Sequence, residues 1–279
     1  MNPLSPVAGA SGDTRVAAAL PPHPPSGVAL PPHPPLGVAL PPHPQLSRYY
    51  ASEAEHRRQV DSLFNQSAPA YDWITQLLSL GSGHWYRRQA LLRAGLAPGM
   101  SVLDLGSGTG VLASHAQRIV GAAGRVVALD PSLGMLREAS GRNVRLRVGA
   151  VADAVPFASE RFDLLTMGYA LRHVADLAAA FAEMRRQLRT RGKLLLLEIT
   201  APRTRIAFGV VKLYLGSVVP RLARLRGGPN ARALMEYYWE TIERCVPPEV
   251  ILDALAAAGF TEVARRVEKG ILSEYTAVR

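Results

Sequence analysis

A short apolar stretch followed by a glycine-rich loop constrains this chain more than any other feature. Residues 102–105 read Val-Leu-Asp-Leu, glycine then recurs at every second position from 106 to 110, and an apolar helical pattern follows over 111–120. This order of strand, tight loop and helix is typical of a turn that binds a nucleotide-like ligand, because glycine lets the backbone turn sharply and lets a ligand lie against the main chain. A dinucleotide fingerprint would need glycine at position 111, which is Val111, and no Lys-Ser/Thr pair follows for a phosphate loop. An ordinary glycine-rich turn is the alternative.

A second acid follows the glycine loop after about twenty residues, the interval at which a ribose-binding acid is expected. Residues 125–129 read Arg-Val-Val-Ala-Leu, which predicts a strand, and Asp130 ends it. Ser132 is suited to cap a further helix. The pattern predicts a ligand that contains a ribose, and a solvated loop acid is the alternative.

Strand and helix patterns alternate through the rest of the chain. We expect strands at 144–148, 162–167 and 193–199, helices at 177–188 and 248–258, and a closing hairpin of strands 261–267 and 271–278. Such alternation predicts an α/β fold with a doubly wound, mostly parallel sheet.

The first 46 residues differ in composition from the rest. A Leu-Pro-Pro-His-Pro unit recurs every ten residues and contains His23, His33 and His43. Dense proline cannot form helix or central strand, and the segment cannot bury enough apolar surface to offset its ordering entropy. We therefore predict a disordered extension over 1–46 and one folded domain over 47–279. Metal binding by the histidines, or docking of the prolines in an aromatic groove, is the alternative.

Within the folded domain we expect helices over 49–95 that lead into the sheet, and an inserted lid over 204–242. Residues 208–220 of this lid are apolar, and Arg221, Arg224 and Arg226 follow. The segment could cap an isoprenoid tail and rest on anionic lipid. A buried lid helix with a solvated basic end is the alternative.

The composition of the chain limits the kinds of ligand and partner that we expect. The single cysteine, Cys245, excludes an internal disulfide framework and a cysteine metal cluster, and we expect no metal. The net charge of +10 suggests an acidic partner, either an anionic membrane or nucleic acid, and 6% aromatic residues without interleaved basic ones disfavour nucleic acid. No apolar run reaches the roughly 18–20 residues of a membrane span, and no secretory signal is visible. We expect a cytoplasmic protein with peripheral contact to a membrane and make no prediction of its oligomeric state.

The motif Asp-x-Gly-x-Gly-x-Gly that starts at Asp104 resembles motif I of class I S-adenosyl-L-methionine (SAM) methyltransferases. Further segments resemble the ubiquinone/menaquinone biosynthesis C-methyltransferase (UbiE-type) family over about residues 60–279. They are Phe64 with Ala68-Pro-x-Tyr71-Asp72, Leu80-Gly81 with His84, Asp130-x-Ser132, Ala152-Asp153-Ala-x-Pro156-Phe157, Leu171-Arg172-His173-Val174-x-Asp176, Tyr237-x-x-Glu240 and Ala258-Gly259-Phe260. The family usually has Asn in place of His173 and Val151, and Ser in place of Gly168.

The resemblance implies a Rossmann-like, seven-stranded sheet with an antiparallel last strand, and a SAM-dependent enzyme that C-methylates a prenylated quinol (demethylmenaquinol or a ubiquinone precursor). The ring and tail stay open. Another small aromatic, a phospholipid head group, or a non-catalytic SAM-binding subunit are the alternatives. The cofactor residues that the resemblance implies are Asp104, Gly106, Gly108, Thr109, Gly110, Asp130, Val151, Ala152, Asp153 and Gly168. Thr109 would contact the methionine end, Asp130 the ribose and Asp153 the adenine, with Gly168 beside the sulfonium.

Carbon methylation of a quinol needs a base for the ring hydroxyl and a positive group to stabilise the phenolate. The resemblance implies that Arg172 faces the substrate, where it could stabilise the anion, although a pKa above about 12 makes it a poor base. His173 titrates near neutrality and is the candidate base, with a capping or surface histidine as the alternative. We favour Arg172 over His173. Tyr71 and His84 are reserve candidates for substrate binding, and structural packing is the alternative for both.

Overall fold

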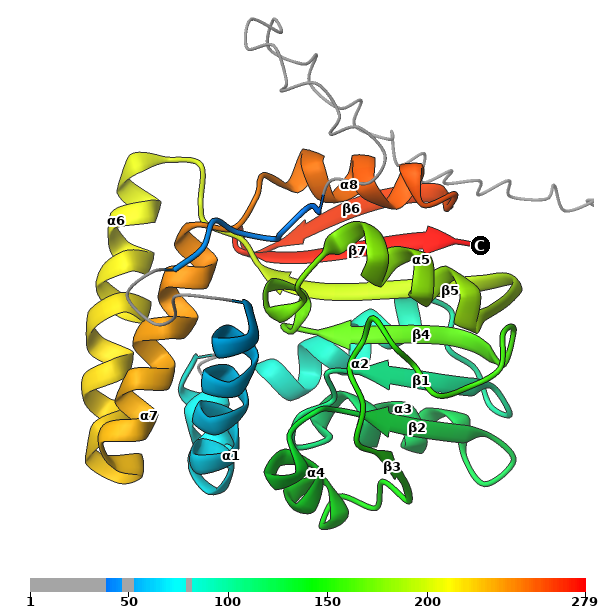
Figure 1. Cartoon of the computed structure of the whole chain (residues 1–279), viewed down its shortest axis with the longest axis horizontal. Coiled ribbons are helices and arrows are strands. Elements are labelled where there is room, and N and C mark those ends of the chain that lie inside the picture. Colours follow the sequence, from blue (N-terminus) through cyan, green and yellow to red (C-terminus); the bar gives the residue numbers. More distant parts are fainter. Residues whose placement is uncertain (1–38, 47–52, 79–81) are drawn as a thin grey trace, which may run out of the picture. The chain divides into compact units, whose positions relative to one another are not determined.

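The computed structural model describes residues 39–46, 53–78 and 82–279 (Figure 1). At its centre lies a seven-stranded sheet in the order β3-β2-β1-β4-β5-β7-β6. The strands are β1 (Ser101–Leu105), β2 (Arg125–Leu129), β3 (Leu146–Val148), β4 (Phe162–Gly168), β5 (Leu188–Ile199), β6 (Thr261–Glu268) and β7 (Leu272–Val278). The first five are parallel, whereas β7 runs antiparallel to both β5 and β6. The predicted α/β class, with a doubly wound, mostly parallel sheet, is confirmed.

The strand order reverses at β1, which lies between β2 and β4. Leu105 pairs with Met167, so the last residues of β1 and β4 lie next to each other. Ligands of doubly wound sheets bind in the crevice outside the carboxyl ends of the strands at such a reversal. We therefore expect the ligand site at the loops that follow β1 and β4.

Side chains that alternate along β1 divide between two cores. Val102 packs in the cluster of α2 (Gly83–Arg93) and α3 (Val111–Val120), with Leu136 of α4 (Leu133–Ser140). Leu103 and Leu105 pack on the other face with α5 (Leu177–Gln187) and α8 (Pro248–Ala257). Both faces of the sheet are thus covered, as buried parallel strands require (Figure 1).

A third apolar cluster lies among helices outside the sheet. It joins α1 (Glu53–Leu78), α6 (Arg205–Leu213), the π-helical η2 (Tyr214–Val218) and α7 (Val219–Glu243). In Figure 1, α6 and α7 stand beyond α1, on the side to which the parallel strands point. These helices therefore lie on the side of the expected ligand crevice.

Some local predictions were wrong at their boundaries. A single helix, α1, continues through Pro69, and it begins at Glu53, later than the predicted start at 49. The next helix, α2, begins at Gly83 and ends at Arg93. β5 begins at Leu188 and not at the predicted residue 193, because Leu188 already pairs with Phe162 of β4.

The disordered extension was also predicted to reach too far, because residues 39–46 pack against the folded domain. Within residues 39–46, Leu40 N donates to Asp176 Oδ1 (3.1 Å), and Pro42 O accepts from Val246 N (2.8 Å). His43 is 5% exposed and Leu46 is 1% exposed. Proline lacks a donor but keeps its carbonyl, so this repeat can accept hydrogen bonds from neighbouring loops and pack. Residues 1–38, which include His23 and His33, lie outside the described residues.

One described segment, Arg205–Leu225, is long and apolar enough to cross a membrane by length and composition alone, with a mean hydropathy of 1.5. The expectation that no run reaches this length was wrong. Phe208, Val211 and Tyr214 of the segment pack against the third cluster, so one of its sides belongs to the protein. Within the parts of the chain that the structure describes, no group of three or more His, Cys, Asp or Glu side chains could hold a metal.

Candidate active site

The glycine loop after β1 needs glycine for two reasons. Gly106, Gly108 and Gly110 have φ of +58°, +56° and +77°, where side chains are strained. A Cβ on Gly106 would lie 2.5 Å from the Cβ of Ala170, so the loop after β4 approaches its bare backbone. A Cβ on Gly108 would meet nothing within 4 Å, and this residue borders a cavity. The loop thus offers open main chain to a ligand.

Asp130 joins this loop to the start of α4. Its Oδ2 accepts from Gly108 N (2.8 Å) and its Oδ1 accepts from Ser132 N (2.8 Å). The carboxylate is nearly buried but borders the cavity. A carboxylate oxygen accepts hydrogen bonds and donates none, so a fixed acid that borders the cavity is suited to hydroxyl donors.

A cavity of about 1080 Å³, its open mouth included, connects the predicted cofactor residues with an aromatic wall. The predicted residues that border it are Gly106, Gly108, Asp130, Val151, Ala152, Asp153, Gly168, Tyr71 and His173. Asp104 and Thr109 border a second recess, which shares Gly106, Gly108, Gly168 and Tyr71 with the cavity. Gly110 caps α3 and borders neither hollow.

Two side chains of this second recess are held by polar contacts. Asp104 is buried and accepts from Ser107 Oγ (2.7 Å) and Thr166 Oγ1 (2.6 Å). Burial raises the pKa of Asp104 to about 6, against the effect of these hydroxyls, so the acid is mostly ionised at neutral pH. Thr109 donates to Asp72 Oδ1 (2.6 Å), and Arg142 forms an ion pair with the same carboxylate. Asp72 thereby ties α1 to the glycine loop.

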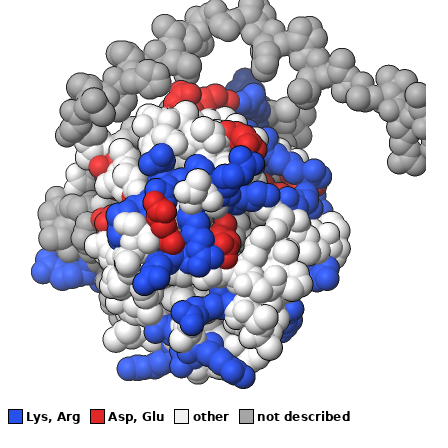
Figure 2. All heavy atoms as spheres, turned by 90° about the vertical axis from the view of Figure 1, so that its right-hand side faces the viewer, with Lys and Arg blue, Asp and Glu red and all other residues white. Residues whose placement is uncertain are grey.

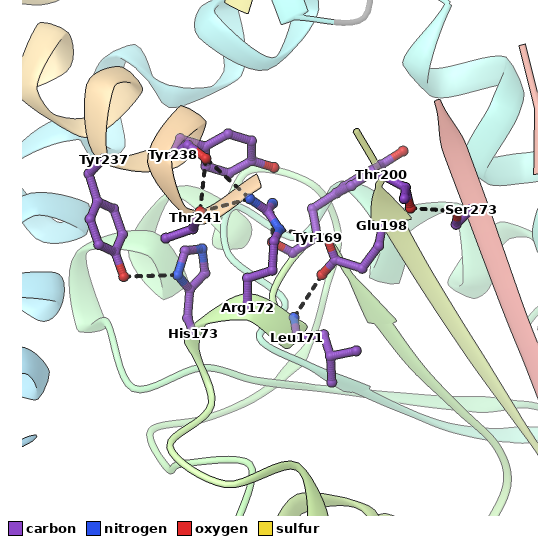
Figure 3. Close-up of polar contacts among 10 residues, drawn as sticks. All are labelled: Tyr169, Leu171, Arg172, His173, Glu198, Thr200, Tyr237, Tyr238, Thr241 and Ser273. Atoms are coloured by element: carbon purple, nitrogen blue, oxygen red, sulfur yellow. Dashed lines mark hydrogen bonds and ion pairs between the residues drawn. The ribbon is translucent and has the colours of Figure 1, made fainter. Parts of the chain in front are cut away.

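The structure contradicts the expectation that Arg172 faces the substrate. Arg172 lies on the short 3₁₀ helix η1 (Leu171–His173), is 0% exposed and does not border the cavity. Its Nε donates to Glu198 Oε2 (2.8 Å) and its Nη1 to Thr241 Oγ1 (2.8 Å), as Figure 3 shows. Burial alone would lower the pKa of Arg172, but Glu198 raises it above the ordinary value. Its charge is thus already compensated inside the protein.

Glu198, near the end of β5, organises this turn. Its Oε1 accepts from Leu171 N (2.9 Å) while its Oε2 binds Arg172. The guanidinium also lies 4.4 Å from the ring centroid of Tyr238 in α7. One buried ion pair therefore connects β5, η1 and α7.

His173, the next residue, does border the cavity. Its Nδ1 is 3.2 Å from the Tyr237 hydroxyl, and the two rings are stacked with centroids 5.5 Å apart. Phe64 of α1 meets the imidazole edge-on at 5.3 Å. The histidine is thus oriented by aromatic neighbours from α1 and α7 (Figure 3 shows its bond to Tyr237).

His84 lies elsewhere. It borders a separate small recess with Asp72 and Arg142, and its Nδ1 is 3.1 Å from His115 Nε2. Burial lowers the pKa of His115 to about 4, with His84 adding to the effect, and burial also lowers the pKa of His84. The structure therefore places His84 at this recess and not at the cavity. Tyr71 is different, because it borders both the cavity and the second recess.

Some functional residues were not predicted. Asn65 Oδ1 accepts from Ser132 Oγ (2.9 Å) and from Gly134 N (2.7 Å), so α1 is also tied to the start of α4. Neither Asn65 nor Asp72 carries a local signal of these partners. Glu198 does carry one, since an acid that interrupts the apolar strand 194–199 needs a buried partner.

The site meets the requirements of an adenosyl cofactor. It combines bare backbone at Gly108, a fixed carboxylate of the kind that accepts from hydroxyls and a bordering loop at 151–153. Two solved structures illustrate the similarity of fold. A SAM-dependent methyltransferase of Thermotoga maritima has a TM-score of 0.55 at 18% identity, covering 78% of this chain and 98% of that one. Phosphoethanolamine N-methyltransferase 2 of Haemonchus contortus, in complex with SAM, has a TM-score of 0.53 at 17% identity, covering 77% and 57%.

Fold and site define a class I SAM-dependent methyltransferase. The model of the ubiE/COQ5 methyltransferase family matches residues 51–279, and the chain belongs to this family. It is 34% identical over 224 residues to the ubiquinone/menaquinone biosynthesis C-methyltransferase UbiE of Shewanella piezotolerans, covering 77% of this chain and 88% of that relative. It is also 34% identical over 223 residues to the demethylmenaquinone methyltransferase of Mycobacterium sp. strain JLS, covering 79% and 94%.

Proposed function

We propose that this enzyme methylates a ring carbon of a prenylated quinol, either demethylmenaquinol or a ubiquinone precursor. The observation that carries the proposal is one cavity that joins the cofactor loops to a wall of Phe64, Tyr71 and His173. A planar ring fits between aromatic side chains, which prefer offset or edge-on contact. The names of the relatives support the same substrate class.

SAM supplies an activated methyl group on its sulfonium. We propose that Asp130 accepts from the ribose hydroxyls and that Val151, Ala152 and Asp153 border the adenine. The backbone at Gly106 and Gly108 and the hydroxyl of Thr109 would hold the methionine part. Gly168, at the end of β4, leaves room beside the sulfonium, because a Cβ there would already touch Leu112 at 3.2 Å.

On the substrate side we propose His173 in place of Arg172 as the group that meets the quinol. A ring hydroxyl must lose a proton before the adjacent carbon attacks the methyl group, and an imidazole in the cavity can accept it. The new carbon–carbon bond forms as the bond between the methyl group and sulfur breaks, which leaves S-adenosylhomocysteine. The methylated carbon then loses its own proton to solvent, and the imidazolium returns its proton to the ring oxygen. The contact with Tyr237 orients the imidazole, while Arg172 positions the turn that carries it.

Product analysis tests the proposal. The purified enzyme is incubated with methyl-labelled SAM and, in separate reactions, with a reduced demethylmenaquinone, a non-prenylated naphthoquinol and phosphatidylethanolamine. We expect label on a ring carbon of the prenylated quinol. Label on the head-group nitrogen, or label only on the non-prenylated ring, would favour the two other methyltransferase alternatives. SAM binding without any transfer would favour a non-catalytic subunit.

We also propose that the enzyme works in the cytoplasm against a membrane, because a prenylated quinol resides in lipid. On the outer side of α6, Ile206, Val210 and Leu213 are 84%, 63% and 63% exposed. Their spacing of four and three residues places them on one face of the helix. The opposite side of α6 packs through Phe208 and Val211, which favours a helix that lies along the surface and does not cross the bilayer.

Charge favours lipid over a second copy of the chain as the occupant of this face. No Asp or Glu occurs between Glu198 and Glu236. The basic residues in this interval are Arg203, Arg205, Lys212, Arg221, Arg224, Arg226 and Arg232. Anionic lipids attract such a segment, whereas two copies of the same face would repel each other.

A further inference from the structure

The recess beyond the glycine loop contains a cation and an acid. Arg87 of α2 and Asp104 of β1 both border it, together with Thr109 and Tyr169. The Arg87 guanidinium carbon lies 4.9 Å from the ring centroid of Tyr169, so the side chain is directed into the recess by an aromatic face. The two opposite charges thus border one hollow, and Gly106, Gly108 and Gly168 border both this hollow and the cavity.

Neither charge neutralises the other through an ion pair. Asp104 has its oxygens bound by Ser107 and Thr166, and Arg87 forms no ion pair within residues 39–46, 53–78 and 82–279. Arg87 acts on its surroundings nonetheless, since it counteracts the effect of burial on the pKa of Asp104 and of Tyr71. A half-buried cation without a carboxylate partner is suited to an anionic ligand.

The direction of the cofactor decides which ligand group reaches this cation. With the adenine at 151–153 and the ribose at Asp130, the amino-acid end has to extend past Gly106 and Gly108 into the recess. That end is a zwitterion with one carboxylate and one ammonium. A hollow with one guanidinium and one carboxylate is complementary to it.

We propose that Arg87 binds the α-carboxylate of the methionine part of SAM, with Asp104 providing negative charge beside the ammonium. This assignment rests on the proposed placement of the adenosyl part. It makes Arg87 a cofactor-binding residue, although no local motif in the sequence distinguishes it from Arg88. Arginine suits the task because its planar fork matches a carboxylate with two hydrogen bonds.

The contact between Arg87 and the carboxylate is tested by changing both the protein and the ligand and measuring binding for each combination. Binding of SAM and of decarboxylated SAM, which lacks only the carboxylate, is measured by calorimetry for the wild type, Arg87→Met and Arg87→Lys. We expect Arg87→Met to weaken SAM binding by about tenfold or more, the size of a lost charged hydrogen bond. Decarboxylated SAM should bind Arg87→Met as well as or better than the wild type, because a repulsive cation has gone. Arg87→Lys should give an intermediate loss for SAM only.

The neighbouring Arg88, which is exposed, supplies the matched control. Arg88→Met should change neither affinity by more than about twofold. Equal loss of both ligands in Arg87→Met would assign the residue a structural role, and unchanged SAM binding would remove it from the site. Either result would overturn the proposal. If Arg87→Met formed less methylated product but bound both ligands like the wild type, Arg87 would act on the substrate, and this result would also overturn the proposal.

Discussion

At the scale of single residues, Asp130 combines two tasks in one carboxylate. It fixes the glycine loop and the start of α4 through Gly108 N and Ser132 N, and it borders the cavity where a ribose is expected. Two such bonds orient the acid before a ligand arrives. Ligand binding therefore does not have to order the Asp130 side chain, which would reduce the affinity.

Asp130→Ala should weaken SAM binding by about tenfold or more, on the order of 1–3 kcal/mol, because two hydroxyls would lose a charged acceptor. Titration calorimetry measures this affinity. Asp163→Ala is the control, since Asp163 binds Ser101 N and Arg189 at the opposite ends of the strands. An Asp130→Ala protein with wild-type affinity would move the ribose site elsewhere.

The histidine pair predicts a loss of stability in acid. The pKa of His115 is about 4 in the folded protein, below its ordinary value of 6.5. Between these two values the unfolded chain takes up a proton that the folded chain does not, so the free energy of unfolding falls as the pH is lowered. His115→Gln should lose less thermal stability than the wild type between pH 6.5 and 4.5, as followed by circular dichroism. Parallel pH curves for the two proteins would contradict this.

At the scale of elements, the pair of Arg172 and Glu198 holds η1 between β5 and α7. Arg172→Met should destabilise the protein by about 3–5 kcal/mol, because Glu198 would stay buried without its partner. Denaturant unfolding measures the loss, and the double variant Arg172→Met/Glu198→Gln should recover part of it. If Arg172→Met kept wild-type stability and SAM affinity but lost turnover, Arg172 would be the catalytic group after all.

The last proline repeat gives a second prediction for an element. Deleting residues 1–46 should lower the Tm, because it removes buried Leu46 and the hydrogen bonds of Leu40 and Pro42 to the domain. Deleting only residues 1–37 is the control, for which the composition predicts little change. Differential scanning calorimetry compares the two. Equal Tm values for both truncations would show that the docked repeat contributes nothing.

The parts of the site that depend on the order of strands and loops along the chain were predictable from the sequence. The glycine loop and Asp130 each follow a strand at a fixed interval, so their neighbourhood in the sheet follows from topology. Arg172 could not be placed this way, because its burial depends on Glu198 and Thr241, which are distant in sequence. The surroundings of His84 could not be predicted for the same reason, since its partner His115 comes from α3.

At the scale of the whole molecule, charge and apolar surface have different distributions. Figure 2 views the right-hand side of Figure 1, from which the parallel strands start, and shows many Lys and Arg with fewer Asp and Glu. Positive charge therefore occurs on more than one face and cannot by itself orient the protein on a membrane. The proposed membrane contact therefore depends on the exposed apolar residues of α6, which share one face of that helix.

Ile206→Asp/Val210→Asp should therefore abolish most binding to lipid while leaving the fold intact, because both side chains are exposed and lose no buried contact. The wild type should sediment with vesicles of phosphatidylglycerol and phosphatidylcholine at least about tenfold more tightly than with phosphatidylcholine alone, and salt should weaken this binding. Val267→Asp, which places one such charge on exposed β6, should bind like the wild type. Equal loss in both variants would indicate a general charge effect. Wild-type binding by the double variant would place the membrane contact on another face, such as the basic surface of Figure 2.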